Sequence, residues 1–598
     1  MQKRNFNFLN LAEIPPYVGY SYQNDNFLNF LHNGKWVKFS AQEFADNVKN
    51  LTLGLKEIGL EKNNSFAILS CSNPLWLMMD FASISAGAIS VPIFSNISKE
   101  NLIFEIENAE IQFIFCDNLE VFKTIKSLSK NFQKIIIYGF ETDDKEVIEF
   151  EDLILIGKKY NQKNPALYEK LIADLKENDL ATIVYTSGST GIPKGVEITH
   201  KNLISQIQAA AKLFPFDQKT DISLSFLPLA HIFERMIASY YITAGISIYF
   251  ADDVKNVGNL LREIKPTVLT VVPRMLEKVY GKIRVGVDEG GLIKKIIGKA
   301  AIKLALNINP KNCSIFKKIF DLLVYKKLRN SLGGKVRMMI CGGAALQPEL
   351  DRFFKNIGVN LFVGYGTTET SPVIAVNYEG HNKVGTIGPA FPGITVKIAE
   401  DGELLAKGPN IMRGYHKDEV KTKEVFAKGD AKGDYNEDWF KTGDLATIDN
   451  DGFIKIIGRK KELFKTSGGK YVSPVPIEQK LVNLGEFFLG ACVIAEGKKF
   501  ISCILLPDFE MLEKYKKKIG MANMSDDEFL KSDFINQKIQ NIISQVNSGL
   551  NHWEQIQKYY LAKDAVSIET GELTPSMKLK RNVIEKKYQK EIEDFYKE

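Results

Sequence analysis

Short apolar runs alternate with segments of helical periodicity from the N-terminus to about residue 390. A helix is predicted, for example, at residues 201–213, because Leu203, Ile204 and Ile207 fall on one helix face. Alternation of strands with helices predicts parallel-type sheets that are covered by helices, so we expect an α/β fold here. The predicted strands span residues 65–70, 112–116, 134–138, 182–185, 268–272 and 336–341.

The pattern changes at about residue 384. Residues 384–457 contain short strand-like runs separated by Gly, Pro, Asn and Asp, which predicts a small β-rich subdomain. A lysine-rich turn follows Gly458, and mixed strand and helix patterns continue to the end of the chain. We therefore expect a large N-terminal domain at residues 1–458 and a small α+β C-terminal domain at residues 459–598.

The longest apolar run spans residues 75–94, and Asp80 interrupts it. A membrane-spanning helix needs about 20 nearly uninterrupted apolar residues, so this run predicts a buried helix and strand. Lys3 and Arg4 are not followed by an apolar stretch, so we expect no secretory signal.

Length, charge and cysteine content narrow the class of protein. A chain of 598 residues is too long for one ordinary core, so at least two domains are expected. The 78 basic and 72 acidic residues give a net charge of +6, which does not indicate a nucleic-acid-binding protein. The six cysteines are scattered singly without a CxxC pair, which argues against a structural zinc site and fits a reducing, cytoplasmic location.

One segment, residues 281–330, is unusually basic. It contains twelve Lys or Arg and three acidic residues, interleaved with Ile, Leu and Phe. Its part at residues 293–306 has the pattern of a basic amphipathic helix. The segment is either a solvated helical hairpin or a peripheral attachment to an anionic membrane surface, and the sequence leaves both interpretations open.

The strongest chemical motif is Tyr-Thr-Ser-Gly-Ser-Thr-Gly-Ile-Pro-Lys-Gly at residues 185–195. Glycines allow backbone N–H groups to turn inward, hydroxyls add hydrogen-bond partners, and Lys194 supplies a cation, which together suit phosphate oxygens. The spacing does not match a Walker A loop. Pro193 and the strand-like residues 196–199 also argue against a helix directly after the loop.

With this loop the chain resembles the adenylate-forming superfamily, which includes acyl- and aryl-CoA synthetases, nonribosomal peptide adenylation domains and luciferases. The other signatures of that superfamily follow in the expected order, and the resemblance covers about residues 35–585. The matching segments are LPLAHIFER at 227–235, CGGAAL at 341–346, GYGTTE at 364–369, KTGDL at 441–445, GRKKEL at 458–463 and SGGK at 467–470.

The resemblance implies which residues bind ATP and magnesium. Tyr365 offers a flat face for adenine, Thr368 a hydroxyl for the α-phosphate, and Glu369 with Thr186 would hold Mg²⁺. Asp444 and Arg459 would bind the ribose. The full predicted nucleotide set is Thr186, Ser187, Gly188, Ser189, Thr190, Gly191, Lys194, Gly343, Ala344, Tyr365, Gly366, Thr367, Thr368, Asp444 and Arg459.

The resemblance also assigns the acyl pocket and the C-terminal domain. His231 and Phe233 would line the acyl pocket, with His231 orienting the carboxylate. The segment LTPSMKLKR at residues 573–581 would carry the essential lysine, with Thr186, Lys194 and Glu369 completing the predicted catalytic set. Lys578 takes this position, and Lys580 remains a competitor.

The C-terminal domain is implied to be mobile. It would rotate about a hinge at Lys461 after adenylation, and the loop of Ser467, Gly468, Gly469 and Lys470 would then serve the coenzyme A side.

The form of LPLAHIFER, the hinge segment and the position of the basic segment resemble the long-chain branch. The sequence therefore predicts a long-chain fatty acid–CoA ligase that uses fatty acid, ATP, Mg²⁺ and coenzyme A. The alternatives are an acyl–acyl-carrier-protein synthetase, an acyl-AMP ligase, or a non-catalytic membrane-binding or scaffold protein that descends from an enzyme. Retention of all the motif residues argues against the scaffold.

Overall fold

The computed structural model describes residues 6–128, 132–144, 146–187, 192–312, 315–427, 439–460, 463–468, 470–485, 487–574 and 579–597. The chain forms two compact units. The first comprises Met1–Lys397, Leu405–Thr442 and Ile448–Lys455, and the second comprises Ile398–Leu404, Gly443–Thr447 and Ile456–Glu598.

The first unit contains two eight-stranded sheets with parallel centres. One sheet has an antiparallel strand at each margin, and the other has antiparallel strands at one margin only. In one sheet the order is β15 (Val373–Val376), β14 (Leu361–Gly366), β13 (Met338–Cys341), β12 (Val268–Val271), β10 (Ile222–Ser225), β11 (Ser247–Phe250), β1 (Leu28–His32) and β2 (Lys35–Phe39). In the other it is β18 (Gly414–Tyr415), β9 (Pro193–Thr199), β8 (Leu180–Ser187), β4 (Ile89–Pro92), β3 (Ser65–Leu69), β5 (Ile111–Cys116), β6 (Lys134–Ile137) and β7 (Val147–Glu149).

All six predicted strands are present in these two sheets. The central strands are buried on both faces, as in parallel sheets covered by helices, and all five residues of β3 are buried. The predicted α/β class is therefore confirmed, with antiparallel margins that the sequence did not indicate. The apolar run at residues 75–94 forms a buried helix, α3 (Pro74–Ser85), and strand β4, as predicted.

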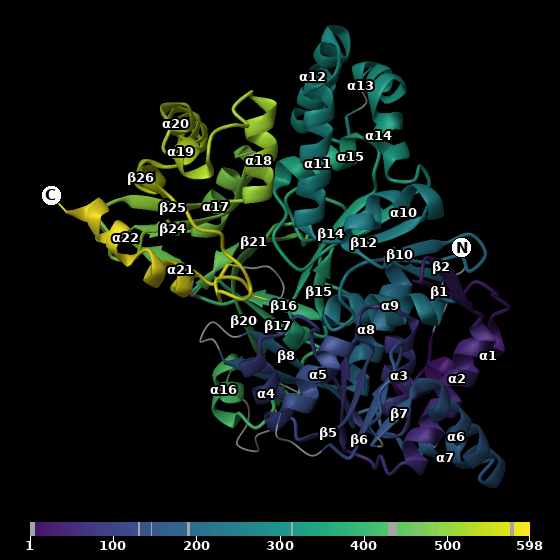
Figure 1. The fold of residues 1–598 in the computed structure, drawn as a ribbon. Coiled ribbons are helices and arrows are strands. Elements are labelled where there is room, and N and C mark those ends of the chain that lie inside the picture. Colours follow the sequence, from purple (N-terminus) through teal and green to yellow (C-terminus); the bar gives the residue numbers. More distant parts are fainter. Residues whose placement is uncertain are drawn as a thin grey trace. The chain divides into compact units, whose positions relative to one another are not determined.

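Helices surround the sheets (Figure 1). They are α1 (Ile14–Ser21), α2 (Ala41–Glu57), α3, α4 (Lys99–Asn108), α5 (Leu119–Ser127), α6 (Phe150–Lys163), α7 (Leu167–Asp174), α8 (His200–Leu213), α9 (Ile232–Ala244), α10 (Val257–Ile264), α11 (Pro273–Asp288), α12 (Leu292–Asn307), α13 (Ile315–Phe320), α14 (Lys326–Ser331), α15 (Pro348–Asn356) and α16 (Glu419–Val425). A π-helical turn, η3 (Asp321–Tyr325), joins α13 to α14.

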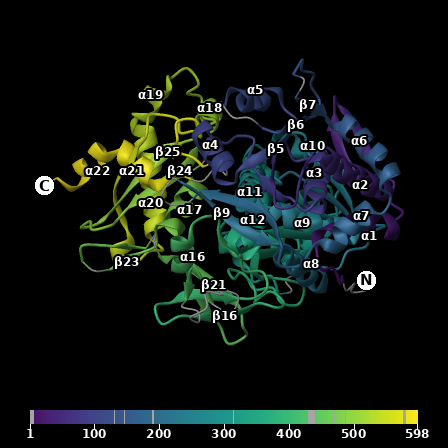
Figure 2. The same ribbon diagram turned by 90° about the horizontal axis from the view of Figure 1, so that it is seen from below.

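Glycines allow two of these helices to approach closely. Figures 1 and 2 show α2 and α6 side by side at the margin of the first unit. A Cβ atom on Gly157 would lie 1.7 Å from the carbonyl oxygen of Asn50, and one on Gly54 would lie 2.4 Å from that of Leu153. Any larger residue at these two positions would therefore separate the helices.

In its described residues, the region predicted to be β-rich contains short strands and the helix α16. Its five-stranded sheet has the order β16 (Thr395–Ile398), β17 (Glu403–Lys407), β20 (Trp439–Ile448) and β19 (Phe426–Ala427), with β21 (Ile454–Arg459) paired to β20.

The C-terminal part of the second unit is α+β. A hairpin of β22 (Phe464–Lys465) and β23 (Tyr471–Val472) precedes a three-stranded sheet of β24 (Phe488–Ile494), β25 (Ile501–Pro507) and β26 (Ile556–Leu561). The helices are α17 (Pro474–Leu484), α18 (Phe509–Lys518), α19 (Asp526–Leu530), α20 (Asp533–Asn547), α21 (Arg581–Lys587) and α22 (Gln589–Tyr596).

Within the described ranges, none of the helices has both the length and the apolar character needed to cross a bilayer.

Candidate active site

The phosphate-loop motif lies between two antiparallel strands, β8 and β9. Thr186 on β8 is the direct partner of Lys194 on β9, so the hydroxyl and the ammonium group flank the base of the same loop. Gly195 packs against the ring of Tyr185, at a position where a Cβ would lie 3.1 Å from the ring. The loop is followed by a strand rather than by a helix, as predicted from Pro193.

Part of this motif cannot be placed. Gly188, Ser189, Thr190 and Gly191 lie outside the described residues, and Ser187 is described only as the last residue of β8.

Tyr415 links Lys194 to Glu369. The strand β18 pairs with β9, which puts the Tyr415 ring 4.8 Å from Lys194 Nζ, within the range of a cation–π contact. The Tyr415 hydroxyl donates a hydrogen bond of 2.8 Å to Glu369 Oε1. The Met412 N–H donates to the Glu369 carbonyl oxygen, also at 2.8 Å, so the 412–415 segment holds both the backbone and the side chain of Glu369.

The electrostatics keep this link in one protonation state. Burial first, and then the negative charge of Glu369, raise the pKa of the Tyr415 phenol well above its ordinary value. Tyr415 therefore stays protonated and donates to the carboxylate throughout the physiological pH range. The sequence analysis did not find Tyr415, because its contacts join residues that are 46 and 221 positions apart and no local pattern marks them.

The GYGTTE motif forms the end of β14 and the turn after it. Gly366 has no room for a side chain, because a Cβ would lie 1.7 Å from the Pro372 carbonyl oxygen. Tyr365, Thr368 and Glu369 are half-buried. Thr367 Oγ1 is buried, and no described residue forms a hydrogen bond with it, so it has capacity for a ligand atom.

Glu369 and Thr186, which were predicted to hold Mg²⁺, supply few ligands, as expected for an ion that binds together with a nucleotide. The described residues contain no cluster of three or more His, Cys, Asp or Glu that could hold a metal without a ligand's help. A single carboxylate and a hydroxyl match a magnesium ion that takes its other ligands from phosphates and water.

The predicted acyl side and the adenine-side loop meet in the first unit. His231 is the N-cap of α9, and its Nδ1 accepts a hydrogen bond of 3.2 Å from the Phe233 N–H. The buried Phe233 ring lies against Gly342, where a Cβ would be 2.8 Å from the ring. Gly343 and Ala344, which follow Gly342, are exposed.

A buried ion pair connects the start of α9 to the strand that carries the phosphate loop. Arg235 donates to both carboxylate oxygens of Asp80, at 2.8 and 2.6 Å, and to Thr182 Oγ1 on β8 at 2.7 Å. Arg235 and Asp80 are 1% and 3% exposed, so each charge depends on the other. The network fixes β8 relative to α3 and α9. In the sequence, the signs of this pair are Asp80 within an apolar run and Arg235 at the end of the LPLAHIFER motif.

In the second unit Asp444 is buried, and Arg459 Nε lies 3.5 Å from Asp444 Oδ1. The N–H of Gly443 donates to Glu403 Oε1 at 2.9 Å, and Lys460 pairs with Glu403 Oε2 at 2.9 Å and also with Asp401. The structure thus brings together the two residues that were predicted to bind ribose.

The predicted coenzyme A loop is described in part. The N–H of Ser467 donates to the carbonyl oxygen of Lys498, Gly468 is exposed, and Lys470 Nζ lies 5.3 Å from the centre of the Trp553 ring. Gly469, Lys461 and Lys578 lie outside the described residues.

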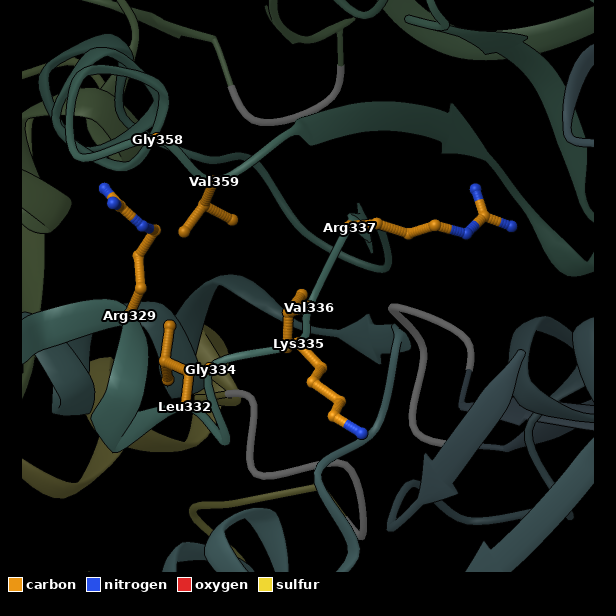
Figure 3. Close-up of a pocket in the computed structure, with 8 residues that line it drawn as sticks. All are labelled: Arg329, Leu332, Gly334, Lys335, Val336, Arg337, Gly358 and Val359. Carbon is orange, nitrogen blue, oxygen red and sulfur yellow. The ribbon is translucent and has the colours of Figure 1, made fainter. Parts of the chain in front are cut away.

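A cavity of about 200 Å³ lies elsewhere in the first unit, where the segment after α14 approaches the turn at Gly358 and Val359 (Figure 3). Its arginines have acidic partners, since Arg329 pairs with Asp321 and Arg337 pairs with Asp221. None of the predicted site residues lines it.

Comparison with known proteins identifies the family. The family described as AMP-binding enzyme matches residues 20–416. The chain belongs to this family. The AMP-binding enzyme C-terminal domain matches residues 462–598.

Relatives of this AMP-binding enzyme match almost end to end. It is 32% identical over 579 residues to a long-chain-fatty-acid–CoA ligase, FadD15, of Mycobacterium bovis, which covers 95% of this chain and 93% of the relative. It is 30% identical to long-chain-fatty-acid–CoA ligase 5 of Mus musculus, over 98% and 87% of the two chains.

The fold is that of the adenylate-forming enzymes. The A domain of carboxylic acid reductase from Segniliparus rugosus, solved with AMP and a co-purified carboxylic acid, superposes with a TM-score of 0.73 at 18% identity. The match covers 98% of this chain and 94% of that one.

Proposed function

We propose that this AMP-binding enzyme is a long-chain fatty acid–CoA ligase. The observation that carries the proposal is the near end-to-end similarity to relatives of that name, across both the AMP-binding and the C-terminal parts. The fatty acid and ATP give acyl-AMP and pyrophosphate, and coenzyme A then takes the acyl group and releases AMP.

In the first step a carboxylate oxygen of the fatty acid attacks the α-phosphorus of ATP. A new P–O bond forms, the bond to the β-phosphate oxygen breaks, and pyrophosphate carries away the electron pair. No protein nucleophile is required, so the residues contribute by positioning and by neutralising charge. Lys194, Thr186 and the amides of the phosphate loop bind the phosphates, and Thr368 contacts the α-phosphate.

Glu369 and Thr186 would hold Mg²⁺, which would neutralise phosphate charge when bound. Tyr415 keeps the Glu369 carboxylate in place through its hydrogen bond and also restricts Lys194 through its ring face. Tyr415 is thus a positioning residue. Thr367 supplies a buried hydroxyl to the same nucleotide.

The remaining nucleotide contacts follow from chemistry. Tyr365 presents its ring to the adenine, alongside the exposed backbone of Gly343 and Ala344. Asp444 accepts from the ribose hydroxyls, and Arg459 donates to the same sugar.

Lys578 supplies positive charge in the first step only. The C-terminal domain then turns about Lys461, and the loop at residues 467–470 serves the reaction with coenzyme A. Lys470 contributes a cation next to the face of Trp553, which suits an anionic cosubstrate.

On the acyl side, His231 orients the substrate carboxylate and Phe233 forms part of the wall. His231 Nδ1 accepts from the Phe233 N–H, which fixes the imidazole at the start of α9. We assign His231 to orienting the carboxylate and not to shuttling a proton.

The protein acts in a reducing compartment such as the cytoplasm. Its basic segment 281–330 makes peripheral contact with an anionic membrane surface. The five described cysteines are free, and four of them are buried, which fits reducing conditions. A long-chain fatty acid is poorly soluble in water and is concentrated at a membrane, so contact there shortens its path to the site.

The test is AMP release from ATP and Mg²⁺ with palmitate, run with coenzyme A, with acyl-carrier protein, and with neither. We expect multiple turnover and palmitoyl thioester with coenzyme A alone. Turnover with acyl-carrier protein alone would establish an acyl–acyl-carrier-protein synthetase instead. No turnover with any of a panel of carboxylic acids would refute the substrate class.

A further inference from the structure

Exposed apolar side chains are concentrated in one part of the first unit. Of the 21 large apolar side chains that are exposed in the described ranges, nine lie between residues 281 and 330. Contiguous apolar surface of this kind usually marks a contact with another molecule. The nine are Val285, Leu292, Ile293, Ile296, Ile315, Phe316, Ile319, Leu322 and Leu323.

The helix formed by α13, η3 and α14 has two apolar faces. One face packs on the core through Tyr325 and Leu328. The other carries Ile315, Ile319 and Leu322, which are spaced by four and three residues as on one side of a helix. Ile315 is 71% exposed and Leu322 is 73% exposed, so this second stripe has no cover among the described residues.

The first turn of α12 is apolar and exposed as well. Leu292 and Ile293 are 76% and 74% exposed, whereas Ala301 and Ala305 in the second half of the helix are fully buried. The beginning of α12 therefore extends beyond the core that its end helps to form.

The two exposed regions lie at the same end of the helices. Asn356 Nδ2 donates to the Ala305 carbonyl near the end of α12, and Arg329 Nη1 donates to the carbonyl of Ile357 near the end of α14. Both helices thus reach the same point of α15 at their C-termini and run in parallel, so that their N-terminal ends are together. Figure 1 shows α12 and α13 rising to the same outer end, and the two helices are in contact.

The charge around this apolar end is strongly positive. The segment 281–330 has twelve Lys or Arg against three acidic residues. Two of the acidic residues are already paired, since Asp288 lies 3.1 Å from Lys299 and Asp321 pairs with Arg329. A second copy of the chain would bring like charges together here, whereas an anionic surface would complement them.

A small cavity lies between α11 and the second half of α12, toward the core end of that helix. It has a volume of about 250 Å³, and its charged lining residues are Arg284, Lys299 and Lys303 together with Asp288, which pairs with Lys299. Guanidinium and ammonium groups of this kind bind phosphate oxygens. Exposed apolar side chains and an excess of basic residues in the same segment match an anionic lipid, which offers acyl chains and a phosphate headgroup.

We infer that the first turn of α12 and the stripe on α13 and η3 insert into the surface of an anionic lipid bilayer. The inference rests on the membrane contact proposed above. It adds that apolar side chains enter the acyl-chain region while the neighbouring lysines extend to the headgroups. Binding should therefore survive salt better than a purely electrostatic contact.

The experiment is flotation of the full-length protein with phosphatidylcholine vesicles, with and without a fraction of phosphatidylglycerol, at low and high salt. The test variant combines Ile315→Ser, Ile319→Ser and Leu322→Ser, which form the exposed stripe on α13 and η3. We expect partitioning into anionic vesicles to fall about tenfold. The matched control combines Leu119→Ser, Leu155→Ser and Val254→Ser, exposed apolar residues outside the segment, and should bind like the wild type.

A lysine variant separates the inference from the proposal beneath it. Lys294→Ser with Lys318→Ser and Lys327→Ser should weaken binding at low salt and have less effect at high salt. If only the lysine variant loses binding, membrane contact stands and insertion is refuted. If the wild type does not bind vesicles at all, both ideas fail, while AMP release with detergent-dispersed palmitate still reports on the ligase activity.

Two further measurements test insertion directly. Phe316→Trp adds a fifth tryptophan to the four of the chain, and brominated lipids should quench its added fluorescence. No added quenching would contradict insertion. Sedimentation equilibrium without lipid tests the other occupants, since self-association of the wild type that the triple serine variant abolishes would assign the surface to a second copy and overturn the inference.

Discussion

The charged groups of the two units are held in different ways. In the first unit Glu369 and Lys194 share one buried partner, Tyr415, and the Asp80–Arg235 pair behind them is almost completely buried. In the second unit the Arg459 side chain is 60% exposed, and its Nε is 3.5 Å from Asp444. The Lys460 side chain is 44% exposed, and it pairs with one exposed carboxylate, Asp401, and one buried carboxylate, Glu403.

The difference teaches which parts of the site are fixed before substrate binds. Buried, hydrogen-bonded charges are preorganised, so they stabilise developing charge without reorganisation. Exposed ion pairs contribute about 0–1 kcal/mol and can exchange partners at little cost. The first unit is thus suited to hold the phosphates, and the second to change its contacts between two half-reactions.

The largest expected effect is that of Lys578→Ala. Adenylation should fall by roughly 10²–10³-fold, because one charge-stabilising donor is removed. Thioester formation from preformed acyl adenylate should be unchanged, because Lys578 is assigned to the first step only. Pyrophosphate release and thioester formation measure the two steps, with Lys580→Ala as the matched control. Equal loss of both steps would remove the division of labour between the units.

Glu369→Ala tests the fixed charge of the first unit. We expect a steep rise in the Mg²⁺ concentration needed for half-maximal AMP release and a loss of about 10²-fold in kcat/KM. A magnesium titration of wild type and variant measures it. An unchanged magnesium dependence would show that Glu369 is not the metal ligand.

Tyr415 separates the two contacts of the link. Tyr415→Phe keeps the ring next to Lys194 and removes the hydrogen bond to Glu369, so kcat/KM for MgATP should fall about tenfold, the weight of one charged hydrogen bond. Tyr415→Leu removes both contacts and should cost more. Equal activity of the phenylalanine variant and the wild type would mean that Glu369 holds its position without help.

Protonation of a buried carboxyl tests a smaller effect of burial in the first unit. Burial raises the pKa of Glu105, on α4 near Tyr185, from 4.5 to about 8. Between these pH values the folded state holds a proton that the unfolded state has released, so stability should fall as pH rises from about 4.5 to 8. Glu105→Gln should flatten this slope in thermal unfolding. An identical slope in the variant would contradict the assignment to Glu105. The alternative source is Glu234, whose pKa burial raises to about 7.

The smallest effect is expected for Lys460→Ala. Its ion pairs with Asp401 and Glu403 are exposed on the lysine side. AMP release should therefore change less than about twofold, and the free energy of unfolding should change by less than about 1 kcal/mol. A loss comparable to that of Tyr415→Phe would erase the distinction between the two units.

Local patterns in the sequence predicted the strands, the buried run at residues 75–94 and the strand after the phosphate loop. They succeeded because apolar periodicity and Pro193 act on neighbouring residues. Motif resemblance assigned both Thr186 and Lys194 to the site, and the hairpin register makes them direct cross-strand partners. Tyr415 was missed because its role arises when β18 pairs with β9, which no local pattern specifies.

Charge within an apolar run had opposite outcomes at two places. Asp80 interrupts one run and is buried, because Arg235, which lies 155 residues later in the sequence, forms an ion pair with it. The lysines of α12 interrupt another run, and the first turn there is exposed with its apolar neighbours. The sequence shows the interruption, but only tertiary structure supplies the partner that decides between the two outcomes.

The contact between Phe233 and Gly342 has an evolutionary consequence. The aromatic wall assigned to the acyl substrate fills the space that any side chain at position 342 would need. The two positions should therefore covary among homologues, with a residue larger than glycine at 342 appearing only beside a smaller one at 233. Under the proposed assignments, a change at Phe233 that alters chain-length preference will also alter the loop expected to receive adenine, so selection on one substrate constrains the recognition of the other.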